Sequence, residues 1–97
     1  MIAVFFHPDA DAELVAAAAY YEEQKEDLGK RFLSSVEDSL ARIRINPQLF
    51  PVIDGNVRRC LTRIFPFGVL FRERADRIEI VAVMHLKRKP GYWKERV

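Results

Sequence analysis

Apolar and polar residues are arranged so that a strand, two helices and three further strands follow one another along the chain. Residues 1–7 form a nearly continuous apolar run, which favours a strand. His7-Pro8 ends this run, because proline disfavours helical backbone in the residue that precedes it. From Pro8 onward, apolar residues recur at three- and four-residue steps, which predicts an amphipathic helix. We expect this helix to end near Gly29, which can adopt a left-handed turn.

The helical spacing of apolar residues resumes at Phe32 and stops at Asn46-Pro47, which predicts a second helix. Residues 48–56 are rich in turn-forming residues, and we expect them to form a loop. Three strand-like runs follow, and short turns separate them. They cover residues 57–64, 67–73 and 77–85.

The predicted order β-α-α-β-β-β indicates an α+β fold in a single domain that spans residues 1–97. Two helices joined by so short a connection are expected to pack antiparallel as a hairpin. The hairpin should cover one face of a mostly antiparallel four-stranded sheet, with the N-terminal strand as one of the four.

Side-chain alternation in the predicted strands separates an apolar face from a basic one. Residues 78, 80, 82 and 84 should share one face, and residues 79, 81, 83 and 85 the other. We expect the helices to cover the more apolar face. The opposite face would then carry Arg59 and Arg63 on one strand and His85 at the end of another.

Composition narrows the class of protein. A hydrophobic fraction of 49% is sufficient for a core, but 97 residues make that core thin. No apolar run approaches the length that crosses a bilayer, and residues 1–7 do not resemble a signal peptide, so a cytoplasmic protein without a membrane partner is expected. The single cysteine, Cys60, is expected to be a small buried residue. Two histidines without ligand-spaced partners predict no metal and no cofactor.

The net charge of +2 conceals an asymmetry between the two halves of the chain. Residues 1–48 carry a balance of −4, and residues 49–97 carry a balance of +6. We therefore expect a localised positive face whose partners are anionic, either nucleic acid or an acidic peptide. The acidic residues Asp9, Asp11 and Glu13 are interpreted as partners of the helix dipole in the first turn.

The last thirteen residues combine a histidine, five cations and two aromatic side chains directly after an apolar run. His85 is either a general acid/base or a strand-end residue bonded to backbone. Arg59 and Arg63 either bind phosphate or pair with Glu79 and Glu73 across strands. The run Lys87-Arg88-Lys89 is either solvated or in contact with a target, and Trp93 is either a core anchor or a stacking platform.

Several short motifs occur in an order and spacing that resembles the RelE/ParE superfamily of toxins. These toxins belong to type II toxin–antitoxin modules and are also described as plasmid stabilisation system proteins. The resemblance covers almost the whole chain. It rests on Pro8-Asp9-Ala10, Tyr20-Tyr21-Glu22, Gly29-Lys30-Arg31-Phe32-Leu33, Asn46-Pro47, Val57-Arg58-Arg59, Phe65-Pro66-Phe67 and the segment from His85 to Trp93.

The resemblance implies a growth-inhibiting toxin that a cognate antitoxin, encoded beside it, holds inactive. In such pairs the tail of the antitoxin wraps the toxin as a helix or an added strand. A thin core and a basic face independently favour an acidic, amphipathic partner segment. The residues expected to contact nucleic acid or a target protein are Arg58, Arg59, Lys87, Lys89, Tyr92 and Trp93.

The superfamily divides by target. RelE-like members are ribosome-dependent endoribonucleases that cleave messenger RNA, and ParE-like members inhibit DNA gyrase. For a metal-independent endoribonuclease, the resemblance implies Arg63, His85 and Arg88 as the catalytic residues. Arg72 is the alternative to Arg63, and Lys87 is the alternative to Arg88. The tyrosine that acts on the 2′-hydroxyl in RelE-like enzymes falls near Tyr92 or Trp93. The arginine that follows the aromatic turn in RelE-like enzymes is replaced here by Gly68. We therefore favour a ParE-like gyrase inhibitor over the endoribonuclease, with a non-toxic relic or regulatory binding protein as a second alternative.

Overall fold

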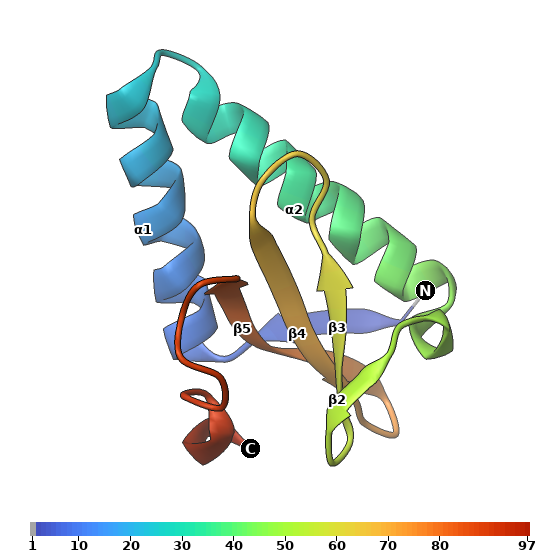
Figure 1. The fold of residues 1–97 in the computed structure, drawn as a ribbon. Coiled ribbons are helices and arrows are strands. Elements are labelled where there is room, and N and C mark those ends of the chain that lie inside the picture. The colour runs from blue at the N-terminus through green and yellow to red at the C-terminus, as the bar shows by residue number, and fades with distance from the viewer. Residues whose placement is uncertain (1) are drawn as a thin grey trace.

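The computed structural model describes residues 2–97 and contains two helices against a five-stranded sheet (Figure 1). The start of the predicted first strand, at Met1, lies outside the described residues. The elements follow in the order β1 (Ala3–Phe6), α1 (Pro8–Gln24), α2 (Leu28–Ile45), a short 3-10 turn (Pro47–Leu49), β2 (Val52–Asp54), β3 (Val57–Leu61), β4 (Phe67–Glu73), β5 (Arg77–His85) and a second 3-10 turn (Lys94–Arg96).

The sheet has the strand order β1-β5-β4-β3-β2, so the first strand lies beside the last. β1 runs parallel to β5, and every other pairing is antiparallel. The predicted α+β fold is confirmed, but the prediction of four strands is wrong. The extra strand, β2, lies within residues 48–56, which we expected to form a loop. It has only three residues, all exposed, at the edge of the sheet, so it carries none of the apolar alternation that reveals a strand.

The helical hairpin is present, and its two arms open as a V on one side of the sheet (Figure 1). α1 begins where the Nδ1 atom of His7 accepts a hydrogen bond of 3.0 Å from the Asp9 N–H, so His7 has the structural role of a cap. The left-handed residue between the helices is Asp27, with a φ of 68°, and not Gly29 as predicted. Gly29 lies in the first turn of α2, where an added Cβ would meet the Ala18 carbonyl oxygen at 2.5 Å. Its function is therefore to let the two helices approach closely.

The main apolar layer lies between the helices and the sheet and contains an aromatic cluster. The ring of Tyr21 lies 4.9 Å from that of Phe65, and the ring of Phe32 lies 4.9 Å from that of Phe67. Such edge-to-face contacts stabilise a small core by more than their buried area alone. Cys60 is fully buried in the same layer, as the sequence predicted.

A second, smaller apolar layer lies on the opposite face of the sheet, beneath the segment that follows β5. It contains Val57, Leu70, Val81, Ala82, Met84 and Trp93, with Tyr92 packed against it. The pairing of β4 with β5 shifts register between Leu70 and Phe71, and this bulge changes the direction in which later β5 side chains point. Strict alternation along β5 is therefore wrong beyond residue 81, and Val83, not Ala82, joins Ile78 and Ile80 in the helix-facing layer.

Candidate functional site

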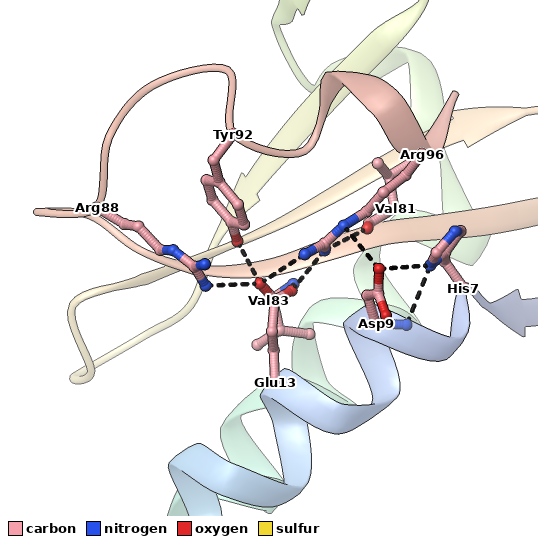
Figure 2. A network of polar contacts seen from close by, with 8 residues as sticks. All are labelled: His7, Asp9, Glu13, Val81, Val83, Arg88, Tyr92 and Arg96. Carbon is pink, nitrogen blue, oxygen red and sulfur yellow. Dashed lines mark hydrogen bonds and ion pairs between the residues drawn. The ribbon is translucent and has the colours of Figure 1, made fainter.

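Glu13 is the centre of a polar network that joins α1 to β5 and to the C-terminal segment (Figure 2). Its carboxylate accepts a hydrogen bond of 3.1 Å from the Val83 N–H. It also accepts hydrogen bonds from Arg88 at 3.0 Å, from the Tyr92 hydroxyl at 2.6 Å and from Arg96 at 2.8 Å. The carboxylate thus collects donors from one strand and from three positions of a segment more than seventy residues away along the chain.

Arg96 is the second anchor of this network. Its Nη1 atom donates to Glu13 and also to the Val81 carbonyl oxygen at 3.1 Å, and its Nε atom lies 3.7 Å from a carboxylate oxygen of Asp9. The side chains of Arg96 and Glu13 are only 12% and 13% exposed. Hydrogen bonds between ionised groups are short and strong, and removing one partner of so well shielded a pair leaves an uncompensated charge.

The network changes the protonation equilibria of its members. Burial alone would raise the pKa of Glu13, but hydrogen bonds from Arg96, Tyr92 and the Val83 N–H outweigh it, so this pKa lies below its usual value. Burial and the hydrogen bond to Glu13 together raise the pKa of Tyr92 far above its ordinary range. The Tyr92 hydroxyl is therefore a fixed donor, and its phenolate form is strongly disfavoured.

The network holds the C-terminal segment across the face of the sheet that the helices leave uncovered. The Tyr92 ring lies between two cations, with the guanidinium carbons of Arg88 and Arg96 at 3.8 and 5.1 Å from its centroid. The neighbouring Trp93 is only 3% exposed and packs into the second apolar layer. Trp93 is therefore an anchor of the segment, which is the simpler of its two predicted roles.

A pocket of about 390 Å³ lies beside this segment on the same face of the sheet. Its wall is part apolar and part polar, and its charged residues are Asp54, Arg59 and Lys94. The aliphatic stem of Arg59 passes over Gly68, where an added Cβ would meet the Arg59 Cδ atom at 3.0 Å. The glycine at this position therefore provides the space in which Arg59 lies flat on the sheet.

The three residues that the resemblance implies for RNA cleavage have side chains with different partners in the structure. Arg63 lies in the turn after β3, 3.7 Å from Asp38 of α2. His85 lies on the helix side of the sheet, with its ring 5.1 Å from that of Phe67, and its Nδ1 atom accepts a hydrogen bond from the Lys87 N–H. The expectation that His85 shares a face with Arg59 is therefore wrong, because of the bulge in β4 and β5. Arg88 is paired with Glu13.

The remaining predicted contact residues have different surroundings. Arg58 donates to the carbonyl oxygens of Gln48 and Phe50 at 3.4 and 2.7 Å, so it fixes the segment that precedes β2. Lys87 and Lys89 are exposed on the turn that follows β5. The alternative in which Arg59 and Arg63 pair with Glu79 and Glu73 across strands is wrong. Glu79 is paired with Arg72, Arg74 and Arg77, and Arg63 lies beside Asp38.

Glu13 and Arg96 are the functional residues that sequence reasoning missed. Glu13 was interpreted as a partner of the helix dipole, but its place on α1 directs it toward β5 and away from solvent. The pattern that points to Glu13 is the basic run at the C-terminus, because these cations need counter-ions in a near-neutral protein. Because Asp9 and Glu13 are four residues apart on one helix face, they were the natural candidates. The acidic and basic halves of the chain are therefore joined in space at this point.

No three His, Cys, Asp or Glu side chains within residues 2–97 come together as a group that could hold a metal ion. None of the helices in this part of the chain is both long and apolar enough to cross a membrane.

Comparison with known proteins agrees with the fold and adds a family. Residues 4–90 match the family described as the ParE toxin of the type II toxin–antitoxin system parDE. The chain therefore belongs to the ParE toxin family, within the RelE/ParE superfamily that the motifs indicated. The C-terminal anchors Tyr92, Trp93 and Arg96 lie beyond the matched residues.

The fold is shared, over most of the chain, with solved structures that include a toxin–antitoxin complex component. One of these structures is described as the chromosomal ParDE TA system from P. aeruginosa, and it matches with a TM-score of 0.65 and 20% sequence identity. The match covers 90% of this chain and 98% of the other. No functionally curated protein matches the sequence.

Proposed function

We propose that this ParE-family toxin arrests growth by binding to and inhibiting DNA gyrase, and that a cognate antitoxin neutralises it. The main support for a gyrase target is that the side chains RNA cleavage would need are engaged by different partners. Arg63, His85 and Arg88 each contact a different set of neighbours, and Gly68 stands where RelE-like enzymes carry an arginine. An inhibitor that acts by binding requires no such catalytic set.

The environment of Tyr92 also favours binding over catalysis. Metal-free RNA cleavage needs a group that can take the proton of the 2′-hydroxyl. Tyr92 is the tyrosine nearest to the position expected for that role, but its hydroxyl already donates to Glu13 at 2.6 Å. Burial and this hydrogen bond raise its pKa, so at neutral pH its hydroxyl has no tendency to act as a base.

Neutralisation by an antitoxin has support from exposed apolar residues. Val52 and Ile53 of the edge strand β2 and Leu86 of the turn after β5 are 50%, 38% and 43% exposed. Apolar residues on an edge strand are a common place for a partner to add backbone and side-chain contacts. A partner bound to these three residues would occupy this surface of the toxin and so keep the toxin from its target.

The first test follows DNA and protein synthesis in parallel after the toxin is induced in a bacterium. Pulse-labelling with thymidine and methionine over the first minutes should show that DNA synthesis stops first. Purified toxin should also inhibit supercoiling of relaxed plasmid by purified gyrase. If protein synthesis stops first and gyrase is unaffected, the toxin acts as a ribosome-dependent endoribonuclease instead.

Two variants make this test specific. Arg63→Ala and His85→Ala remove residues that an RNase would use, so a gyrase inhibitor should lose little of its growth arrest with either one. Loss of arrest in both variants, with fold and antitoxin binding retained, would contradict the proposal. If the intact chain causes no arrest at any expression level, the protein is a relic or a regulatory binding protein and the toxin assignment fails.

A further inference from the structure

Arg59 is unusual among the arginines that are half-buried in residues 2–97. Five of these six arginines form hydrogen bonds or ion pairs with carboxylates or carbonyl oxygens, namely Arg42, Arg58, Arg72, Arg77 and Arg96. The side chain of Arg59 forms none with any described residue, and its Nε atom is sealed from solvent without an acceptor. A sealed donor without a partner costs free energy, so native proteins rarely retain one without a reason.

The position of Arg59 suggests what would satisfy it. Arg59 lines the pocket of about 390 Å³ beside the C-terminal segment. The other two charged residues there, Asp54 and Lys94, already pair with each other at 2.9 Å. The pocket therefore holds one uncompensated positive charge and has room for a group from outside.

We propose that this pocket receives an aspartate or glutamate side chain from an apolar, acidic segment of the antitoxin, and that its carboxylate pairs with Arg59. This inference rests on the proposed function, because it identifies where the antitoxin of that proposal binds. A carboxylate can accept two hydrogen bonds from the fork of a guanidinium group, which is the strongest geometry for such a pair.

The walls of the pocket favour a peptide over a nucleic acid. Ile53, Met84, Leu86, Pro90 and Trp93 line it, so the group that enters should be flanked by apolar residues. A nucleic-acid strand would need several free cations along successive phosphates. The pocket is lined by only two cations of the described residues, and one of them, Lys94, is paired with Asp54. The Asp54 carboxylate at the rim would also repel a phosphate chain.

The first measurement uses the free toxin and small anions. Because the Nε–H of Arg59 is sealed from solvent, its proton should exchange slowly and give a visible signal in a nitrogen–proton NMR spectrum. Sodium acetate, added at constant ionic strength, should shift this arginine signal saturably and leave the backbone amide signal of Arg44 unaffected. Inorganic phosphate is the matched probe for a nucleic-acid site. If acetate has no effect, or if phosphate binds more tightly than acetate, the proposal is overturned.

The second measurement uses the antitoxin encoded beside the toxin gene. Arg59→Met keeps the length of the stem but removes the charge, and it should weaken binding about tenfold or more in isothermal titration calorimetry. Arg44→Met is the control, because Arg44 is exposed and forms no hydrogen bond or ion pair with residues 2–97. A thermal melt of each variant verifies folding. Should Arg59→Met fail to fold, the acetate titration of the wild-type protein still decides whether a carboxylate binds.

The two proposals can fail separately. If the antitoxin does not bind the wild-type toxin at all, the proposed neutralisation is wrong and the antitoxin is not the occupant of the pocket. If the antitoxin binds wild-type and Arg59→Met toxin equally well, neutralisation stands, but the role of Arg59 is overturned. If Arg59→Met weakens binding, Arg44→Met does not, and acetate shifts the Arg59 signal, these results together support the pocket as the site of an antitoxin carboxylate.

Discussion

Ile64 has a backbone conformation that a β-branched residue rarely adopts. Its φ is 76°, in the left-handed region, and its side chain is 85% exposed. The turn around it is held in place by the Ser35 hydroxyl, which donates to the Arg63 carbonyl oxygen at 2.7 Å, and by the Thr62 hydroxyl, which donates to the Phe65 carbonyl oxygen at 2.8 Å. The surrounding contacts therefore impose a strained conformation on a side chain that contributes little burial.

Replacing this residue should stabilise the protein. Asparagine tolerates the left-handed region, so Ile64→Asn should raise the free energy of unfolding by about 1 kcal/mol. Urea titration followed by circular dichroism measures the change. Ile45→Asn is the control. Ile45 is similarly exposed, at 83%, but its backbone does not have a positive φ. An Ile64→Asn variant no more stable than Ile45→Asn would show that the turn stores no strain.

Glu13 connects α1 to the C-terminal segment, and the ionisation of its carboxylate makes this connection sensitive to acid. The pKa of Glu13 is lower in the folded protein than its unfolded value of about 4.3. A lowered folded pKa means that the ionised carboxylate favours folding. This contribution is complete above the unfolded pKa and is lost as the pH falls through the folded pKa.

Glu13→Gln should therefore destabilise the protein at neutral pH and much less in acid. Loss of the charge leaves Arg96 with weaker acceptors, so we expect a cost of about 2 kcal/mol at pH 7 that shrinks below about pH 4. Thermal melts of wild type and variant between pH 7 and pH 3 provide the measurement. Glu23→Gln is the control, since Glu23 is exposed on the same helix and forms no ion pair with residues 2–97. A difference that stays constant with pH would contradict the role given to the Glu13 carboxylate.

The elements that could be predicted from sequence are those with strong local patterns. Both helices and the hairpin of β4 and β5 have regular apolar spacing or a short turn, and their existence and order follow from it. β2 could not be predicted because three exposed residues at an edge carry no such pattern. The bulge in β4 and β5 could not be predicted either, because it depends on pairing between strands and leaves no mark in either strand alone.

The candidate site was harder to predict than the fold, and for a related reason. Residue type alone marked Arg59, Tyr92 and Trp93 as candidates. Their different roles depend on contacts made across the sheet: Trp93 is buried, Tyr92 is bonded to Glu13, and Arg59 has no acceptor. A site assembled from distant segments becomes visible only when the fold brings them together.

At the scale of the whole molecule, the sheet has an apolar layer on each face, and only one is covered by helices. The other is covered by a short segment held through a few side chains, chiefly Glu13, Arg96 and Trp93. Exposed apolar residues remain around it, notably Ile53 and Leu86. A small domain that leaves this much apolar surface uncovered gains stability from a partner that covers it.

The antitoxin should therefore raise the melting temperature of the toxin markedly. At a free antitoxin concentration one hundred times its Kd, linkage predicts about 2.7 kcal/mol of stabilisation, or a rise of about 10 to 20 °C for a domain of this size. Differential scanning fluorimetry with increasing antitoxin measures the shift, and an unrelated acidic protein of similar charge is the control. The shift should shrink in high salt if the Arg59 pair contributes, because added salt screens the partly exposed charges. A melting temperature that does not change with antitoxin, or that rises equally with the control protein, would mean that the uncovered face is not a specific surface for this partner.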